Sequence, residues 1–195
     1  MSTSIRRILG VDPGLTRCGV GIVDVDRSRR AQLVHVSVVR SAVDDAIGDR
    51  LVAIAEGLRR AIREFQPDAV AVERVFAQHN RQTVMGTAQA SGIALLVAAE
   101  AGLPAQTHTP SEVKAAVTGY GSADKRQVQA MIARILKLEK PPQPADAADA
   151  LAIALCHAWR GGTSRAAEAA EEMTAAQRAW HEAERVARTK VRSRA

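Results

Sequence analysis

Apolar positions along the chain predict an α/β fold that starts with three strands. Runs rich in Val and Ile, with the length of strands, occupy about residues 5–11, 19–25 and 33–39. From residue 46 to 65 apolar side chains recur every three or four positions, which predicts one apolar face of a helix. The run Ala-Val-Ala-Val-Glu then has the length of a buried strand. A strand, helix, strand order predicts a parallel crossover, most simply between the first strand and this one.

The second half of the chain is predicted to be mostly helical. A helix over residues 80–101 carries many Gly and Ala residues, which permit close packing against another helix. The segment Leu-Pro-Ala-Gln-Thr-His-Thr predicts a last strand, followed by a short helix and by a longer helix that Ser122 opens. A final helix over residues 144–159 has no charged residue from Ala150 to Trp159, so we expect it to be buried. The predicted architecture is a central mixed five-stranded sheet flanked by helices.

Two acidic residues stand directly after strands that we expect to be neighbours. Asp12 follows Ile-Leu-Gly-Val, and Glu73 follows Ala-Val-Ala-Val. Ligands and catalytic groups in open α/β sheets gather where the carboxyl ends of strands leave a crevice, so both carboxylates would face one crevice. Each acid also has an ordinary explanation. Asp-Pro-Gly is favourable turn chemistry, and Glu73 can pair with Arg74 or a nearby lysine.

Two further acids open the final helix. Asp146 and Asp149 lie three residues apart, about 60° round the helix and about 4.5 Å along it, so they share a face. The helix dipole explains an acid in the first turn, and Asp146 behind Pro144 fits that explanation. An otherwise buried helix should nevertheless not carry two uncompensated carboxylates, because moving a charge out of water unpaired costs several kcal/mol. Either arginine or a metal ion would compensate them.

Four converging carboxylates in a basic protein favour divalent metal ions as this compensation. Without cations the carboxylates would repel one another and any phosphate. Two ions about 3.5 to 4 Å apart would reverse that repulsion, activate a water and stabilise the leaving oxygen of a phosphoryl displacement. All-oxygen ligands favour Mg²⁺, with Mn²⁺ able to substitute, over zinc. The predicted ligands, which would hold two ions per active site, are Asp12, Glu73, Asp146 and Asp149.

Length and composition narrow the domain organisation and the compartment. The chain has 195 residues, 47% of them hydrophobic, which suffices for one domain of ordinary size and a tail. We predict a domain over residues 1–162 and an Ala-, Glu- and Arg-rich tail, helical or disordered, over residues 163–195. No apolar stretch has the length of a membrane span, and the N-terminus lacks the apolar region of a signal peptide. We therefore expect a cytoplasmic protein with no membrane partner.

Charge indicates the kind of partner, whereas the cysteines and histidines add no further site. A net charge of +6 and an isoelectric point of about 10 suit a polyanion such as nucleic acid. An aromatic content of 3% argues against binding single strands through stacked bases. Cys18 and Cys156 lack the spacing of a metal site and are expected to be buried as small hydrophobes. His79, His108 and His157 show no mutual metal-binding spacing, which favours structural or surface roles.

Four segments together resemble the RuvC family of bacterial Holliday junction resolvases, nucleases of the ribonuclease H-like superfamily. In chain order they are ILGVDPGLTRCGVGIVD, VERVF, GYGSADKRQVQ and PPQPADAADALAIALCHA. The similarity extends from about residue 6 to 160, and four ordered motifs are more specific than an Asp-x-Gly pattern alone. It implies a ribonuclease H-like α/β fold. It also implies an endodeoxyribonuclease that resolves four-way DNA junctions by paired, symmetric, metal-dependent hydrolysis during recombination and repair.

The same resemblance implies residue roles and partners. The four acids named above match the family's acidic cluster, which binds metal and cuts DNA. Lys114 and Lys125 match basic positions near the DNA path, and Phe76 matches an aromatic position beside the junction centre. Arg74, a further expected DNA contact, stands where the family more often has Gln, so contacts beside the preceding acid are expected to differ. The family works as a homodimer with the RuvA and RuvB branch-migration proteins, and the small-residue helix at 80–101 is the candidate dimer interface.

Alternative interpretations remain at this point. Lys114 and Lys125 also fit as ordinary surface lysines, and Phe76 as a hydrophobic plug under a loop. An actin-like ATPase or sugar kinase has a similar first loop, but it needs two such domains and this chain has length for one. An idle scaffold for branched DNA or RNA gains nothing from repulsive carboxylates beside phosphate. A single-domain nuclease acting on RNA stays open, because two-metal hydrolysis tolerates either sugar.

Overall fold

A mixed five-stranded sheet organises the part of the chain that the computed structural model describes, residues 5–75 and 81–160. Within this part, residues 6–40 are mostly strand and residues 110–160 mostly helix. In chain order the elements are β1 (Arg6–Asp12), β2 (Arg17–Val25), β3 (Ala31–Arg40), α1 (Ile47–Phe65), β4 (Ala69–Glu73), α2 (Arg81–Glu100), β5 (Ala105–His108), α3 (Pro110–Thr118), α4 (Lys125–Ile135) and α5 (Ala145–Arg160).

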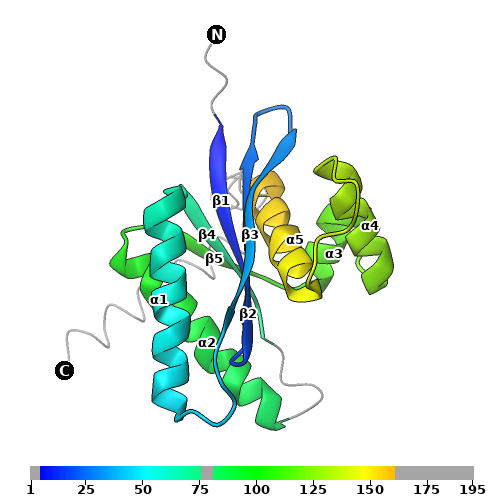
Figure 1. Cartoon of the computed structure of the whole chain (residues 1–195). Coiled ribbons are helices and arrows are strands. Elements are labelled where there is room, and N and C mark those ends of the chain that lie inside the picture. Colours follow the sequence, from blue (N-terminus) through cyan, green and yellow to red (C-terminus); the bar gives the residue numbers. More distant parts are fainter. Residues whose placement is uncertain (1–4, 76–80, 161–195) are drawn as a thin grey trace, which may run out of the picture. The chain divides into compact units, whose positions relative to one another are not determined.

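The sheet combines an antiparallel half with a parallel half. Its strand order is β3-β2-β1-β4-β5. Strands β1, β2 and β3 form an antiparallel meander, whereas β4 runs parallel to β1 and β5 runs parallel to β4 (Figure 1). The predicted parallel neighbourhood of the first and fourth strands is therefore confirmed. As a result, the carboxyl ends of β1, β4 and β5 lie at the same end of the sheet.

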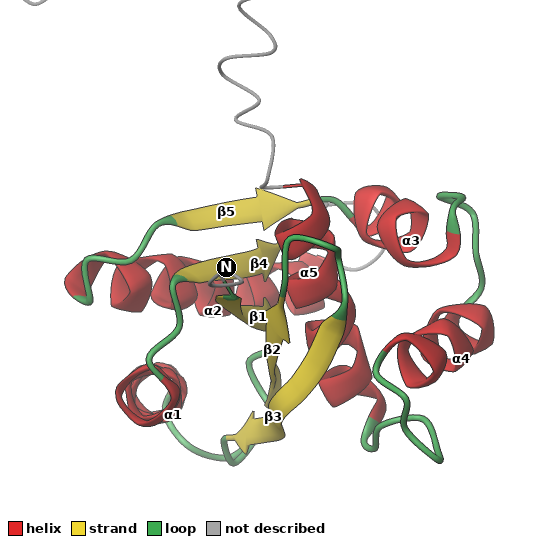
Figure 2. Ribbon diagram, turned by 90° about the horizontal axis from the view of Figure 1, so that it is seen from above, coloured by secondary structure: helices red, strands yellow, loops and turns green. Residues whose placement is uncertain are grey.

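Helices cover both faces of the sheet. Figure 2 shows α1 and α2 on one side and α3, α4 and α5 on the other. Each side has its own cluster of buried hydrophobic side chains, and β1 contributes to both because successive residues of a strand point to opposite faces. Ile8 belongs to the cluster under α5, while Leu9 and Val11 belong to the cluster under α1 and α2.

This alternation decides where the strand-terminal acids point. Asp12 lies four residues after Ile8 in β1, and Glu73 lies two residues after Ala71 in β4. Ile8 and Ala71 both pack in the cluster under α5. Because alternate residues of a strand share a face, Asp12 and Glu73 keep the same side. Both carboxylates therefore stand on the face of the sheet that α5 covers.

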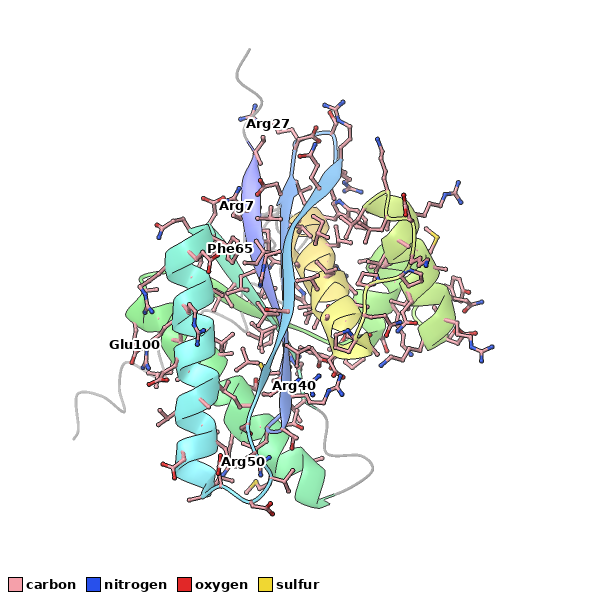
Figure 3. All side chains as sticks on the ribbon, viewed as in Figure 1. Arg7, Arg27, Arg40, Arg50, Phe65 and Glu100 are labelled. Atoms are coloured by element: carbon pink, nitrogen blue, oxygen red, sulfur yellow. The ribbon has the colours of Figure 1, made fainter. Side chains whose placement is uncertain are left out.

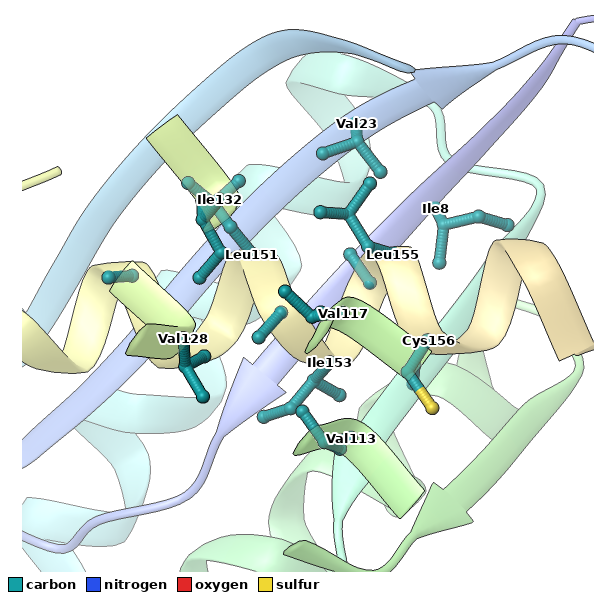
Figure 4. Packing of buried hydrophobic residues seen from close by; sticks show 14 of the residues in the cluster. Ile8, Val23, Val113, Val117, Val128, Ile132, Leu151, Ile153, Leu155 and Cys156 are labelled. Carbon is teal, nitrogen blue, oxygen red and sulfur yellow. The ribbon is translucent and has the colours of Figure 1, made fainter. Parts of the chain in front are cut away.

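The α5 helix is the central element of that face. Its residues 147–157 are all buried except Asp149. Figure 4 shows Leu151 and Leu155 of this helix among side chains from the strands and from α3 and α4, including Ile8 and Val23. A helix that is apolar on nearly all sides is stable only when it is enclosed in this way.

Three glycines allow α5 to approach the sheet backbone. Gly10 of β1 and Gly21 of β2 are partners across the strands, and Gly19 of β2 is the partner of Asp12. A Cβ at any of the three would collide with backbone atoms of α5, and at Gly19 the collision is with the carbonyl of Asp146. The glycines thus fix the distance between the strand that ends in Asp12 and the helix turn that carries Asp146.

One predicted helix start is wrong. Asp124, not Ser122, caps α4: its carboxylate accepts from the Gln127 N–H, and the Gln127 side chain accepts from the Asp124 N–H. This reciprocal arrangement needs an acceptor side chain three residues after the cap. Ser122 has Lys125 in that position, which only donates.

Further expectations from the sequence concern the cysteines, membrane spans and the tail. Cys18 and Cys156 are both fully buried, as predicted, and they do not form a disulfide with each other. Among the helices described, none is both long and apolar enough to cross a bilayer. The predicted tail over residues 163–195 lies outside the described residues, as does His79.

Candidate active site

The four predicted acids come from three elements and meet at one end of the sheet. Asp12 ends β1, Glu73 ends β4, and Asp146 and Asp149 lie in the first turns of α5. Parallel pairing brings the two strand ends together, and the glycine contacts bring the helix start against β2. As a result, the charges of Glu73, Asp146 and Asp149 act on Asp12, although Asp149 lies 137 positions (149 − 12) after it in the sequence.

Negative charge is concentrated at this end of the sheet. Burial, and then the charges of Glu73, Asp149 and Asp146, raise the pKa of Asp12 to about 8. Burial, followed by the charge of Asp149, also raises the pKa of Glu73, and nearby lysines oppose that rise. A raised pKa means that the ionised carboxylate lacks sufficient positive charge around it. The site therefore has the electrostatic character of a cation-binding site.

Two basic side chains compensate the helix acids. The Arg17 Nε donates to Asp146 Oδ2 at 2.5 Å, and the Lys125 Nζ donates to Asp149 Oδ2 at 2.8 Å. The hydrogen bond to Asp149 is also the main reason why the pKa of Lys125 is raised. Arginine, one of the two compensations expected from the sequence, is thus present at Asp146, and a lysine takes this role at Asp149.

The donor chemistry of the four acids fits a hard divalent cation. Carboxylate oxygens are the ligands that Mg²⁺ and Mn²⁺ prefer, and the repulsion around Asp12 would be relieved by such an ion. Within the described residues, no three Asp, Glu, His or Cys side chains are as yet arranged to hold a metal. Asp146 and Asp149 are engaged with Arg17 and Lys125 instead. A bound ion would compete with these partners for the charge of the two acids.

A depression of about 230 Å³ opens beside the acids. It is lined by two carboxylates and two lysines together with small and apolar side chains. The charged members are Glu73, Lys114, Lys125 and Asp149. Lysines opposite carboxylates suit a phosphodiester that has to approach an acidic cluster. Lys114 and Lys125, the basic residues predicted near the DNA path, therefore lie at the acids.

Arg74 and Phe76 differ from the lysines in what the structure shows. Arg74 is exposed, and its guanidinium donates to the Thr107 hydroxyl at 3.2 and 3.4 Å rather than to Glu73. The expected alternative of a Glu73–Arg74 pair is therefore wrong, because adjacent strand residues point to opposite faces. Phe76 lies outside the described residues, so its contact with the junction centre stays a prediction.

No sequence pattern pointed to Arg17 or to a buried arginine that supports the same turn. Arg50, labelled in Figure 3 near the start of α1, donates to the Thr16 hydroxyl at 2.7 Å and to the Ser41 hydroxyl at 3.0 Å. Ser41 in turn donates to the carbonyl of Leu15 at 2.6 Å. These bonds hold the turn between β1 and β2, which joins Asp12 to Arg17. The partners are far apart in sequence, so only the strand pairing reveals them.

A buried histidine pair lies behind Glu73. His108 is the β5 partner of Glu73, and its Nε2 lies 3.1 Å from Nδ1 of His157 in α5. Burial, and then the neighbouring His108, lower the pKa of His157 to about 4. The absence of metal-binding spacing in the sequence did not exclude this contact, because strand β5 and helix α5 bring the two rings together. The structural role expected for both histidines agrees with their burial.

Sequence comparisons identify close relatives over most of the chain. The family model described as crossover junction endodeoxyribonuclease RuvC matches residues 8–157. The protein of that name from Leifsonia xyli subsp. xyli (strain CTCB07) is 59% identical over 191 residues, which cover 92% of each chain. The protein of that name from Salinispora arenicola (strain CNS-205) is 60% identical over 166 residues, covering 85% of this chain and 95% of the relative.

Solved structures show the same fold. T. thermophilus RuvC in complex with Holliday junction substrate superposes with a TM-score of 0.76 at 36% identity, over 80% of this chain and 94% of that one. The yeast mitochondrial Holliday junction resolvase shares the fold, with a TM-score of 0.56 at 13% identity over 77% of this chain and 78% of that one. The expected ribonuclease H-like fold is thereby confirmed. This chain belongs to the RuvC family of crossover junction endodeoxyribonucleases.

Proposed function

We propose that this chain resolves four-way DNA junctions by hydrolysing phosphodiesters at the acidic end of its sheet. The observation that carries the proposal is the convergence of Asp12, Glu73, Asp146 and Asp149 on one face of the sheet. Each acid would be both a metal ligand and a catalytic residue. Membership of the RuvC family supports DNA as the substrate over RNA and over nucleotides.

The residues of the site divide into a rigid and an adjustable part. Asp12 and Glu73 are held by neighbouring strands and have no ion-pair partner among the described residues. Asp146 and Asp149 each share one oxygen, Oδ2, with a basic side chain, which would compete with a metal ion for their charge. Mg²⁺, with two ions per site, would supply the charge that activates a water and stabilises the leaving oxygen, and Mn²⁺ would substitute.

The lysines would position the DNA backbone. Lys114 and Lys125 line the depression beside Glu73 and Asp149. A phosphate placed there would gain charge-assisted hydrogen bonds from ammonium groups and would be drawn toward the carboxylates that hold the ions. Arg74, exposed at the end of β4, would contact DNA farther along the same edge. Phe76 lies outside the described residues, and its contact with the junction centre is part of the proposal.

Assembly and location complete the proposal. Symmetric cuts in two strands require two active sites, and a two-fold homodimer is the commonest way to supply them. Exposed apolar side chains on α2 support this helix as the interface: Met85, Leu95 and Leu96. The RuvA and RuvB branch-migration proteins are the proposed partners, as in the family, and the cytoplasm is the proposed location because the substrate is DNA.

Cleavage of a synthetic four-way junction tests the proposed function. With Mg²⁺ present, the protein should cut the junction in preference to a linear duplex and an RNA–DNA hybrid. Asp149→Asn should abolish cutting, because it removes a proposed metal ligand. Asp149 is the most informative acid to change, since it lies in the second helical turn, where the helix dipole does not explain it. Asp26→Asn is the matched control, since Asp26 is an acid in a surface ion pair outside the site. Preferential cutting of the hybrid would contradict the proposal and favour the RNA nuclease.

A further inference from the structure

Arg17 is a basic side chain of the site that neither the family resemblance nor the charge pattern singled out. It begins β2, two residues before Gly19, which faces Asp12 across the strands. Alternate residues of a strand share a face, so Arg17 points to the side that α5 covers. There its guanidinium meets Asp146, and both side chains stay partly exposed, at 41% and 28%.

The Arg17–Asp146 pair occupies one oxygen of a carboxylate that the proposed metal site requires. Among the described residues, Asp146 is the only acid that pairs with Arg17. A carboxylate oxygen that accepts from a guanidinium cannot give its full charge to a divalent ion. Metal binding therefore has to weaken this pair, and the arginine released by it needs another anion.

A DNA phosphate is the anion that junction binding would bring to this site. Arg40 of β3 is the Cα partner of Arg17, is exposed, and takes part in no ion pair of the described residues. Residues directly opposite on neighbouring strands have their Cβ atoms within about 5.5 Å and on the same face. Two arginines thus occupy paired positions on neighbouring strands beside the acidic site. Planar guanidinium groups match the geometry of phosphate oxygens.

We propose that Arg17 is an exchangeable counter-ion, which holds Asp146 while the site lacks metal and moves to a DNA phosphate when a divalent ion binds. The inference rests on the proposed metal and junction binding and adds a coupling between them. A metal ion releases Arg17 from Asp146 for a DNA phosphate, and a DNA phosphate holds Arg17 away from Asp146. Metal should therefore tighten junction binding, and the junction should tighten metal binding by the same factor. Arg17 would then make the site charge-balanced at every stage.

Metal binding without DNA tests the first half of the exchange. Mn²⁺ affinity is measured from the signal of free Mn²⁺ in electron paramagnetic resonance, for the wild type, Arg17→Gln and the control Arg30→Gln. Arg30 forms a comparable surface ion pair with Asp26 outside the site. Removing the competitor should tighten Mn²⁺ binding about two- to fivefold, the range expected for an exposed ion pair, while the control stays at the wild-type affinity. An unchanged or weaker affinity in Arg17→Gln would overturn the proposal.

Junction binding tests the second half. Affinity for a four-way junction is measured in EDTA and in Ca²⁺ for the same three proteins. The wild type and Arg30→Gln should bind more tightly in Ca²⁺, and Arg17→Gln should lose most of that gain. Retention of the full gain in Arg17→Gln would show that Arg17 does not move to phosphate. Should circular dichroism show that Arg17→Gln is unfolded, Arg17→Met, which also removes the charge but keeps a long apolar stem, serves in both measurements with the same expected directions.

Failure of the coupling and failure of the proposed function give different results. Asp146→Asn removes the same ion pair but also a proposed ligand, so it should weaken Mn²⁺ binding. If the wild type bound no Mn²⁺, or if Asp146→Asn bound it as well as the wild type, the proposed metal site itself would be wrong. Normal Mn²⁺ binding that depends on Asp146 but not on Arg17 would contradict the exchange alone.

Discussion

Asp12 is expected to lower the stability of the folded protein, while its carboxylate is a proposed metal ligand. It is largely withdrawn from water, and three of the four charges that act on it are acidic. Asp12→Asn keeps the shape and removes the repulsion, so the melting temperature in EDTA should rise, by about 2–4 °C for each kcal/mol relieved. Cleavage should fall about a hundredfold or more, since even outer-shell partners of metal ligands contribute about 10- to 100-fold. Thermal melts and junction cleavage check both effects.

A lower melting temperature for Asp12→Asn would contradict this account of the acid. It would show that Asp12 stabilises the turn after β1, as the favourable turn chemistry of Asp-Pro-Gly suggests. Junction affinity separates the two cases further. A ligand role predicts that binding of the junction in EDTA is retained, whereas a folding role predicts that binding and cleavage are lost together.

His157 makes stability depend on pH in a defined window. Its pKa is about 4 in the folded protein against an ordinary value of 6.5, because the buried ring next to His108 resists a charge. The unfolded chain therefore binds the extra proton first, and stability is lost as pH falls from about 6.5 to about 4, by up to roughly 3 kcal/mol. His157→Gln, which cannot titrate, should flatten urea unfolding free energies over that window. An unchanged slope would assign the pH dependence to other groups.

Individual site residues were predictable from the sequence where a charged residue stands in or directly after an apolar segment. Asp12 and Glu73 follow buried strands, and Asp149 interrupts an apolar helix, so local sequence alone marks each of them as needing an explanation. Arg17, Arg50 and the histidine pair carry no such local signal. Their roles depend on which strands are neighbours and on which face each residue occupies, and those facts belong to the sheet rather than to the local sequence.

The contact between β2 and α5 is the element-level feature that assembles the site. A Cβ on Gly19 would meet the Asp146 carbonyl and the Asp12 side chain. Gly19→Ala should therefore push the start of α5 outward, with a loss of about 1–3 kcal/mol of unfolding free energy and weaker Mn²⁺ binding. Gly48→Ala is the matched control, because nothing lies within 4 Å of its Cβ position in α1. Denaturant unfolding and Mn²⁺ titration of both variants check the prediction.

Equal effects of Gly19→Ala and Gly48→Ala would show that α5 does not rely on the close approach. Loss of stability with full Mn²⁺ affinity would show instead that the helix moves without carrying the acids away. Only a combined loss, confined to Gly19→Ala, fits a helix whose distance from β2 sets the separation of Asp12 and Asp146.

Elements were easier to predict than the contacts between them. The three- and four-residue spacing of α1 and the short apolar run of β4 are local signals, and the parallel crossover follows from their order. The cap of α4 was misplaced because a serine with favourable cap chemistry lies two residues before the true cap, Asp124. The glycine contacts with α5 were not predictable, since a glycine in a strand is equally typical of a bulge or a weak point.

At the scale of the whole molecule, the net positive charge and the four acids have opposite effects on DNA. A net charge of +6 attracts a polyanion from a distance, while the four acids repel the phosphate that has to reach them. Salt should therefore weaken junction binding with or without metal, because phosphate contacts release counter-ions. Divalent ions should promote cutting at the acids and, through Arg17, also increase junction affinity. The salt dependence thus arises from the net positive charge, and the divalent-ion dependence from the acidic site.

The last prediction concerns α2 as the interface of the proposed dimer. Leu96 is 51% exposed on this helix, and Val52 is 54% exposed on α1, so a charge at either position should leave the core intact. If α2 is the interface, Leu96→Glu should convert a dimer into a monomer, because a charge buried unpaired in an interface costs several kcal/mol. Val52→Glu should remain a dimer. Light scattering at assay concentrations checks the oligomeric state of both.

The products of cleavage connect that interface to function. A dimer presents two active sites to one junction, so the wild type and Val52→Glu should cut both strands of a plasmid-borne four-way junction and linearise the plasmid. A Leu96→Glu monomer keeps its acids but acts on one strand at a time, so nicked circles should accumulate. If Leu96→Glu stayed dimeric and linearised the plasmid while Val52→Glu did neither, the interface would lie on α1. If the wild type were monomeric with and without DNA, paired cutting would need another source of symmetry.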